Sequence, residues 1–373
     1  MTDISYSNVN DNTPILVGNS QLTDKRGING FNYLEILKEV SEEAILDCGA
    51  SMQLNKHIDT VAVIRFVADT PHRDSATSNL WGYPNMPRSL SNALNIPNQN
   101  EIYTTTGGNS PQLALNEVAN RIKDNQIECA LLAGGEALDT FVSRLKEGLE
   151  VNWADDPGGR PESIGKSLDG TNDHEKLHGL FDPSSVYPLF ANSLRGANHQ
   201  TVDEHMQDTG MLFEEFSRVA SKNEFAWFPI HRSAEEIAEV KPENRMIGLP
   251  YTKYMNSIMR VNQSCAMVMM SAKKARELGV PESKWIFMYS GACLNDIWNV
   301  SDRVDYYSSP AIKACTDSVF DLANISINQV DFIDLYSCFP SAVQIAMKEL
   351  SLEANDPRGL TVTGGLPYFG GPG

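Results

Sequence analysis

The sequence lacks long apolar runs and is poor in basic residues. No apolar stretch approaches the roughly 18 residues that a membrane-spanning helix needs. The chain carries 30 Lys and Arg residues against 48 Asp and Glu residues, a formal net charge of −18. This excess of negative charge argues against nonspecific binding to nucleic acid or to an anionic membrane. We therefore expect neither nucleic acid nor a membrane among its partners.

The cysteines are unpaired in sequence. None of the six belongs to a Cys-x-x-Cys pair, which favours reduced, mostly buried thiols in the cytoplasm. Residues 1–13 are polar and acidic, unlike a signal peptide or an Arg-rich transit peptide. With 373 residues, of which 41% are apolar, the sequence predicts a cytoplasmic globular protein of one large domain or two ordinary ones.

A thiol is also missing from a turn that would suit one. Residues 102–112 pass from an extended segment through Gly107 and Gly108 into a helical pattern that reaches Ile122. The free N–H groups of a helix N-terminus favour negative charge, and covalent catalysis at such a turn needs Cys or Ser. The turn offers Asn109 and Ser110, whereas the nearest cysteine, Cys129, lies inside the apolar strand 129–133 that Gly134 and Gly135 are expected to end.

A helix–turn–strand pattern occurs twice. Helix 33–48 precedes strand 60–64, and helix 311–322 precedes strand 332–335. The pair predicts a duplicated α/β unit, although coincidence is the alternative because this pattern is common in α/β proteins. Further strands are expected at 15–18, 265–270 and 285–289, with a helix at 272–278. Residues 147–250, with one good helix at 211–223, form a long polar excursion of the kind that often builds binding sites.

Two motifs carry possible chemistry. His174–His178 fits the HExxH pattern of zinc hydrolases, with Glu175 as base. Its surroundings allow little more than one helical turn, so a solvated loop is the favoured interpretation and no metal site is predicted. Cys338 lies between a buried strand and a helix at 342–350, where a thiol pKa can fall. The alternative for Cys338 is a small buried apolar residue beside Phe339.

With these pieces placed, the chain resembles the thiolase superfamily, most closely the sterol-carrier-protein-type thiolases and related thiolase-like proteins. Four segments match in order along nearly the whole chain. Residues 133–136 resemble the family's AGG-plus-acidic segment, 261–279 the opening of its second half, 336–339 its HDCF motif and 364–372 the stretch that carries its GHP motif.

The resemblance implies a five-layered α/β/α/β/α fold of two duplicated halves. The first half is expected at 14–265, with an inserted loop domain at about 147–250. The second half is expected at 266–373 and is incomplete, because the family's final strands and helix have no counterpart. The resemblance also implies that coenzyme A or acyl-CoA is the substrate or ligand, with no covalently bound cofactor. A homodimer, or a partner subunit that completes the fold, is expected.

The departures from the family concern its catalytic groups. The nucleophilic Cys falls on Asn109, or on Ser110 if the turn shifts by one residue, and the GHP His falls on Gly371. Only Cys338 and Phe339 of the HDCF motif remain. One hypothesis is an acyltransferase of the acetyl-CoA acetyltransferase type, in which Cys338 reacts, Ser110 assists, and N–H groups near Gly107, Gly108, Gly370 and Gly371 bind the oxyanion. The other is a subunit that binds acyl-CoA or serves as a scaffold without turnover.

Overall fold

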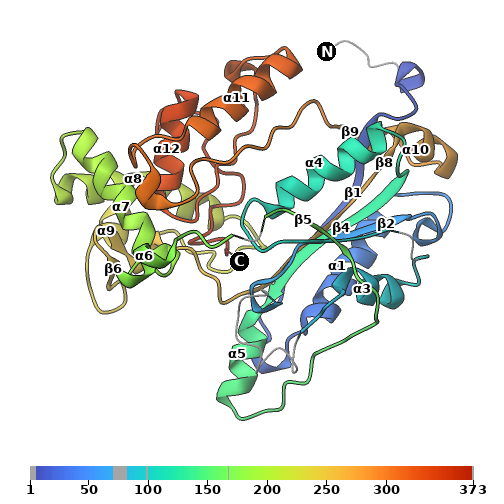
Figure 1. Ribbon diagram of the computed structural model, residues 1–373, viewed down its shortest axis with the longest axis horizontal. Coiled ribbons are helices and arrows are strands. Elements are labelled where there is room, and N and C mark those ends of the chain that lie inside the picture. Colours follow the sequence, from blue (N-terminus) through green and yellow to red (C-terminus); the bar gives the residue numbers. More distant parts are fainter. Residues whose placement is uncertain (1–5, 70–81, 98–99, 167, 372–373) are drawn as a thin grey trace. The chain divides into compact units, whose positions relative to one another are not determined.

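The chain folds into two compact units. The computed structural model describes residues 6–69, 82–97, 100–166 and 168–371 (Figure 1). Unit 1 comprises Met1–Ser167 and Arg260–Gly291, and unit 2 comprises Leu168–Met259 and Ala292–Gly371. The two units are defined by contacts within the folded chain. They do not test whether the chain is duplicated, so the halves predicted at 14–265 and 266–373 stay a prediction.

Unit 1 is built on a seven-stranded mixed sheet. The strand order is β5-β3-β2-β4-β8-β1-β9. Strands β5, β3, β2 and β4 run parallel to one another, whereas β8 pairs antiparallel with both β4 and β1. The strands are β1 (Pro14–Thr23), β2 (Thr60–Val63), β3 (Asn100–Thr104), β4 (Cys129–Ala137), β5 (Glu162–Ile164), β8 (Asn262–Ser271) and β9 (Ile286–Phe287).

Helices cover both faces of this sheet. Along β4, Cys129 and Leu131 pack in the same apolar cluster as the buried side of α1 (Tyr33–Asp47), together with α3 (Met86–Leu94). The alternating residues Ala130 and Leu132 pack instead with α4 (Ser110–Lys123). The period of two along the strand thus places α1 and α4 on opposite faces (Figure 1). Unit 1 also contains α5 (Leu138–Lys146) and α10 (Ala272–Leu278).

A glycine permits the close approach of α1 to β1. Strand β1 has an irregular register between Leu16 and Gly18. A Cβ on Gly18 would lie 2.4 Å from both the carbonyl oxygen of Ala44 and the sulfur of Cys48. Helix α1 itself begins with a capping box, in which Asn32 and Glu35 bond to each other's backbone N–H groups.

Unit 2 is mainly helical. Its strands β6 (Met246–Gly248) and β7 (Tyr251–Thr252) form a two-stranded sheet. Its apolar cluster joins α8 to the residues that surround Cys338 and to Tyr368. Among all described residues, no helix is both long and apolar enough to cross a membrane. The helices of unit 2 are α6 (Asp173–Leu177), α7 (Pro183–Ala197), α8 (Val202–Ala220), α9 (Ala234–Ala238), α11 (Pro310–Ala323) and α12 (Pro340–Leu350).

Three expectations about single elements are wrong. Residues 332–335 form no strand; Leu335 only donates its N–H to the carbonyl of Leu360, and Phe332 is 80% exposed. The pair Gly134–Gly135 does not end β4, which continues to Ala137 because both glycines pair with β8. A Cβ on Gly135 would lie 2.6 Å from the Cβ of Ser264 in β8. The excursion at 147–250 holds two long helices rather than one, since α7 begins with its own capping box at Asp182.

Candidate functional site

Cys338 lies in the apolar interior of unit 2, directly before α12. Its side chain belongs to the cluster that includes Phe339 and Tyr251, and it is 8% exposed. Burial raises the pKa of the Cys338 thiol to about 11, and the hydroxyls of Tyr187 and Tyr336 offset part of that rise. A helix N-terminus favours a lowered thiol pKa, but here the pKa is raised, and the thiol is protonated at neutral pH.

Gly371 meets the same short segment as Cys338. The carbonyl of Cys338 accepts the N–H of Ser257 at 3.3 Å, and the N–H of Gly371 donates to the carbonyl of Ile258 at 2.8 Å. A Cβ on Gly371 would lie 1.8 Å from the hydroxyl oxygen of Ser257. The family resemblance singles out positions 338 and 371, and both contact residues 257–258. Ser257 occupies the space that a side chain at position 371 would need.

The glycine-rich C-terminal stretch serves close packing. Gly364 and Gly365 have positive φ angles of 108° and 77°, and added Cβ atoms would collide with Ala220 and Phe216 of α8. Gly370 also has a positive φ, 127°. Because the Gly371 N–H is already donated to Ile258, an oxyanion there would have to share or displace that bond. A ligand-binding role for Gly370 and Gly371 stays a prediction.

In unit 1, the turn before α4 has the expected shape, and its two polar side chains differ sharply. Ser110 is 2% exposed, and its hydroxyl donates to the carbonyl of Thr105 at 2.6 Å. Asn109 is exposed and makes no capping hydrogen bond. Gly107 accepts the N–H of Ser110 through its carbonyl, at 2.9 Å, and Gly108 is exposed. The Ser110 hydroxyl therefore fastens the turn, and the catalytic roles proposed for Asn109 and Ser110 stay predictions.

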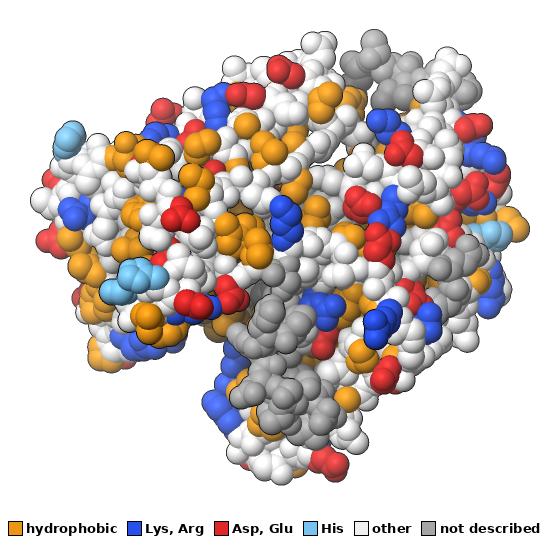
Figure 2. Space-filling model, viewed as in Figure 1, with side chains coloured by type: hydrophobic (Ala, Val, Ile, Leu, Met, Phe, Trp, Pro, Cys, Tyr) orange, Lys and Arg blue, Asp and Glu red, His pale blue; other side chains and the backbone are white. Residues whose placement is uncertain are grey.

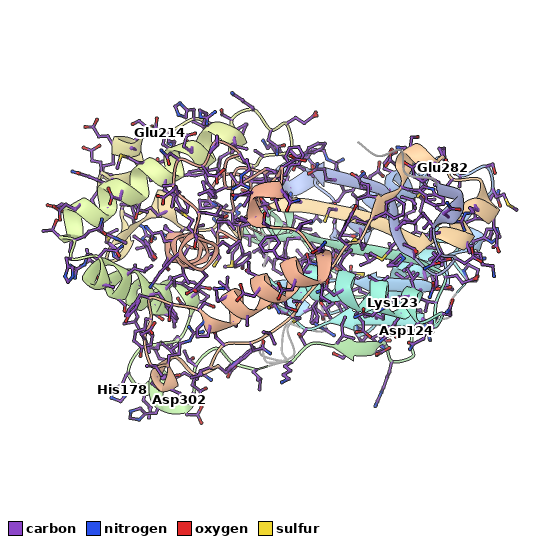
Figure 3. The ribbon with its side chains drawn as sticks, turned by 90° about the horizontal axis from the view of Figure 1, so that it is seen from above. Lys123, Asp124, His178, Glu214, Glu282 and Asp302 are labelled. Atoms are coloured by element: carbon purple, nitrogen blue, oxygen red, sulfur yellow. The ribbon has the colours of Figure 1, made fainter. Side chains whose placement is uncertain are left out.

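The HExxH segment lies in α6, a helix of five residues, except for His178, which caps its C-terminal end. Glu175 is 3% exposed, and its carboxylate accepts the N–H groups of Ser301 at 2.6 Å and Asn172 at 2.7 Å. Figure 3 shows the side chains of His178 and Asp302 near the same end of unit 2. Glu175 thus joins α6 to the segment around Ser301, and the described residues contain no group of three metal-ligating side chains.

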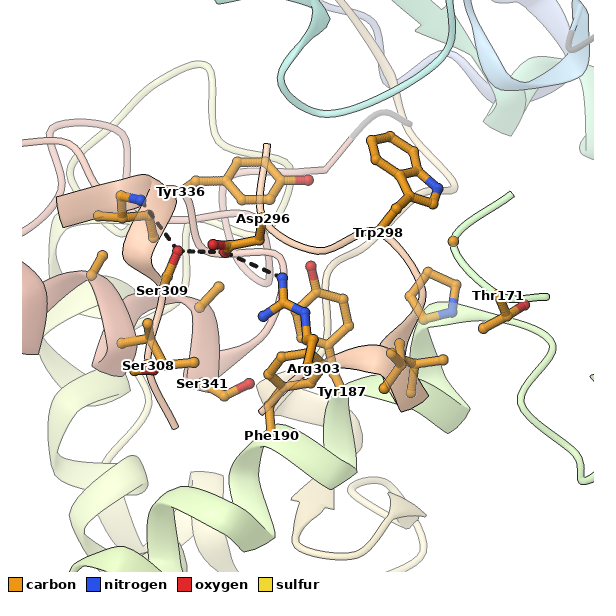
Figure 4. A pocket seen from close by; sticks show the side chains of 18 of the residues that line it. Thr171, Tyr187, Phe190, Asp296, Trp298, Arg303, Ser308, Ser309, Tyr336 and Ser341 are labelled. Atoms are coloured by element: carbon orange, nitrogen blue, oxygen red, sulfur yellow. Dashed lines mark hydrogen bonds and ion pairs between the residues drawn. The ribbon is translucent and has the colours of Figure 1, made fainter. Parts of the chain in front are cut away.

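A cavity of about 480 Å³ opens beside Cys338 within unit 2. Tyr187 and Tyr336, whose hydroxyls lower the pKa of the Cys338 thiol, also line this cavity (Figure 4). Asp296 lies in its wall, paired with Arg303 at 3.2 Å and with the hydroxyl of Ser309 at 2.6 Å. No sequence pattern marks Asp296, Arg303 or Tyr187 as site residues, because they come from separate segments that only folding brings together.

The likeness to one solved structure decides the family. No family model matches the chain. A monomeric SCP2-thiolase-like protein, type 1, from Mycobacterium smegmatis is 31% identical and superimposes with a TM-score of 0.80, covering 97% of this chain and 68% of its own. This chain belongs to the SCP2-thiolase-like proteins. The resemblance seen in the sequence and the thiolase-like α/β fold are thereby confirmed.

Three further proteins are similar to this SCP2-thiolase-like chain at lower identity. An acetyl-CoA acetyltransferase from Methanocaldococcus jannaschii is 24% identical over 245 residues, so the alignment spans 57% of that relative's length. An Ltp2–ChsH2(DUF35) aldolase is 14% identical with a TM-score of 0.68 and covers 97% of this chain and 87% of its own. The dimeric peroxisomal thiolase of Saccharomyces cerevisiae is also 14% identical, with a TM-score of 0.62. The alignment covers 98% of this chain and 88% of the thiolase. The two solved structures support the fold alone.

Charges of both signs are mixed on one face of this SCP2-thiolase-like protein. On the face drawn in Figure 2, acidic side chains are interspersed with basic ones among the described residues, and no broad basic area is seen there.

Proposed function

We propose that this SCP2-thiolase-like protein binds an acyl-CoA thioester beside Cys338 and does not run the thiolase reaction. The observation that carries this proposal is the pairing of a protonated, buried Cys338 thiol with a glycine at the position of the family's imidazole. With a pKa of about 11, roughly one thiol in 10,000 is ionised at pH 7, and no imidazole stands at position 371 to take its proton.

The turn at Asn109 and Ser110 supports the same proposal. The side-chain amide of Asn109 is no useful nucleophile. The Ser110 hydroxyl donates a hydrogen bond to the backbone carbonyl of Thr105 rather than to a base. Groups that act as a unit lose most of their effect when members are replaced, so residual thiolase turnover is expected to be lower by several orders of magnitude.

Calorimetric titration with acetyl-CoA, and with coenzyme A as a reference, tests the proposal. Saturable binding of the thioester without release of free coenzyme A supports it. Absence of any binding by the wild-type protein overturns the proposal.

Acyl transfer through Cys338 is the second candidate. It is favoured by the two tyrosine hydroxyls at the sulfur, which stabilise a thiolate relative to an otherwise apolar setting. Incubation with radiolabelled acetyl-CoA, followed by acid quenching and peptide mapping, distinguishes the two functions. Label on the Cys338 peptide that disappears in Cys338→Ala supports transfer, whereas its absence in a protein that binds the thioester supports binding alone.

We also propose that a second protein chain binds to unit 2. Helix α11 has no buried residue among those described, and Leu322 and Phe332 are 70% and 80% exposed. One structural neighbour carries a second component, ChsH2(DUF35), in its name. Light scattering on the purified protein tests the homodimeric alternative: the mass of two chains supports a homodimer, and the mass of one chain directs the search to a different subunit.

A further inference from the structure

Five aromatic side chains line the cavity beside Cys338, among aliphatic and polar ones. Its volume, about 480 Å³, lies within the range of small-molecule pockets. It is enclosed by α7, α11, α12 and the segment from Asp296 to Arg303. Flat ring faces favour flat partners, through offset stacking and edge-to-face contacts. The aromatic residues are Phe181, Tyr187, Phe190, Trp298 and Tyr336.

The charged groups of the cavity are already paired. Asp296 binds Arg303 at 3.2 Å and also accepts the N–H of Ala311 at 3.0 Å. The carboxylate of Asp182 caps α7 by accepting the N–H of Ser184 at 2.8 Å. Among the described residues that line the cavity, no cation is left to balance a phosphate or carboxylate. Burying such an anion there would be costly, so the occupant is neutral.

One buried hydroxyl in the cavity wall has spare hydrogen-bonding capacity. Ser341 is fully buried, and its backbone N–H donates to the hydroxyl of Tyr251 at 3.2 Å. The Ser341 hydroxyl lies close enough to help lower the pKa of Tyr251, against a larger rise from burial, yet it meets hydrogen-bond geometry with no described group. Figure 4 places it among the aromatic side chains. A buried hydroxyl of this kind favours an occupant with a matching polar atom.

We propose that this cavity holds a flat, neutral ring that carries a hydroxyl or keto group, as the acyl part of the bound thioester. The inference rests on the proposed binding of a thioester beside Cys338. Tyr187 and Tyr336 join the two places, because both line the cavity. The Tyr187 ring also stacks on that of Phe339, the residue next to Cys338, with ring centroids 4.3 Å apart. A thioester carbonyl near Cys338 thus directs its acyl group between these rings, toward Ser341.

Three thioesters test the inference in calorimetric titrations of the full chain. They are 4-coumaroyl-CoA, cinnamoyl-CoA, which lacks only the ring hydroxyl, and octanoyl-CoA, which lacks the ring. We expect cinnamoyl-CoA to bind at least about threefold more tightly than octanoyl-CoA, since a rigid ring loses less freedom on binding. We expect 4-coumaroyl-CoA to bind about fivefold more tightly than cinnamoyl-CoA, the effect of one net hydrogen bond.

Two variants separate the contributions. Ser341→Ala should remove the preference for 4-coumaroyl-CoA and leave cinnamoyl-CoA binding within about twofold, whereas the exposed Ser318→Ala should change neither. Ala342→Leu, in the cavity wall, should weaken both ring-containing thioesters. Equal binding of octanoyl-CoA and cinnamoyl-CoA overturns the inference that the occupant is a ring. A preference for 4-coumaroyl-CoA that survives in Ser341→Ala overturns the role of Ser341. Failure of all thioesters, acetyl-CoA included, overturns the proposed function instead.

Discussion

The hydroxyl oxygen of Ser257 lies 1.8 Å from the point that a Cβ on Gly371 would occupy. Position 371 is the one where the family resemblance places an imidazole, so this contact prevents a side chain there from being restored alone. We predict that Gly371→His lowers the free energy of unfolding by about 1–3 kcal/mol, the usual cost of overpacking. Ser257→Gly in the same chain should recover part of that loss, because it removes both Ser257 atoms that crowd the site.

Urea denaturation measures this effect. Gly196→His is the matched control, because Gly196 has open space around the position of its Cβ and is exposed on α7. A Gly371→His protein as stable as the Gly196→His protein would contradict the crowding by Ser257.

The two polar residues of the turn before α4 should respond differently to truncation. Ser110→Ala removes a buried hydrogen bond to the carbonyl of Thr105 and should cost about 1–2 kcal/mol of unfolding free energy. Asn109→Ala, at an exposed position without a capping bond, should stay within about 0.5 kcal/mol. Thermal or urea unfolding compares the pair, and the reverse order of effects would refute a structural role for Ser110.

Alkylation of Cys338 should depend steeply on pH. Since the pKa of this thiol is about 11, its rate with iodoacetamide should rise roughly tenfold per pH unit from pH 7 to about pH 10. Tyr336→Phe removes a hydroxyl that lowers the pKa, so it should slow the reaction further, whereas Tyr289→Phe, at an exposed position, should not. Mass spectrometry of the Cys338 peptide gives the rates, and a plateau below pH 9 would rule out the raised pKa.

The same thiol makes stability depend on alkaline pH. Its folded pKa, about 11, lies above the value of about 8.5 for an unfolded cysteine. The neutral form is therefore favoured by folding: its contribution is complete below about pH 8.5 and is lost as the pH rises through about 11. Cys338→Ala should show a smaller loss of stability than the wild type over this interval, and equal losses would argue against the assignment.

Glu175 should act as a structural carboxylate rather than as a catalytic base. Its hydrogen bonds from the N–H groups of Ser301 and Asn172 lower its pKa. Glu175→Ala should therefore speed amide hydrogen exchange at Ser301, and His178→Ala should not. Because the folded pKa is lowered, the stabilisation is present above about pH 4.3 and is lost as the pH falls further. Unchanged exchange at Ser301 in Glu175→Ala would count against this role.

The regular elements of unit 1 follow from local sequence patterns. Continuous apolar runs predicted β4 and β8, because both faces of the sheet are packed against helices. The helical spacing of apolar residues predicted α4. The predicted end of β4 was wrong because glycine breaks strands on average, whereas here Gly135 lets β8 approach closely. The strand at 332–335 was wrong because its apolar residues have no neighbouring strand among the described residues.

The candidate site was predictable only where a motif marks it. Cys338 and Gly371 followed from the resemblance, and the structure brings them to one segment. Ser257 carries no recognisable signal, because its importance arises from a contact with a residue 114 positions later in the chain, from 257 to 371. The cavity residues Asp296 and Ser341 were likewise unpredictable, since burial and pairing, rather than spacing, give them their roles.

The most direct test is to determine what the protein holds after exposure to one equivalent of acetyl-CoA. Protein-bound and free material are separated by gel filtration, and both are analysed by mass spectrometry. The account predicts intact acetyl-CoA in the protein fraction and an unmodified protein mass. A protein heavier by one acetyl group, accompanied by an equal amount of free coenzyme A, would contradict binding without transfer.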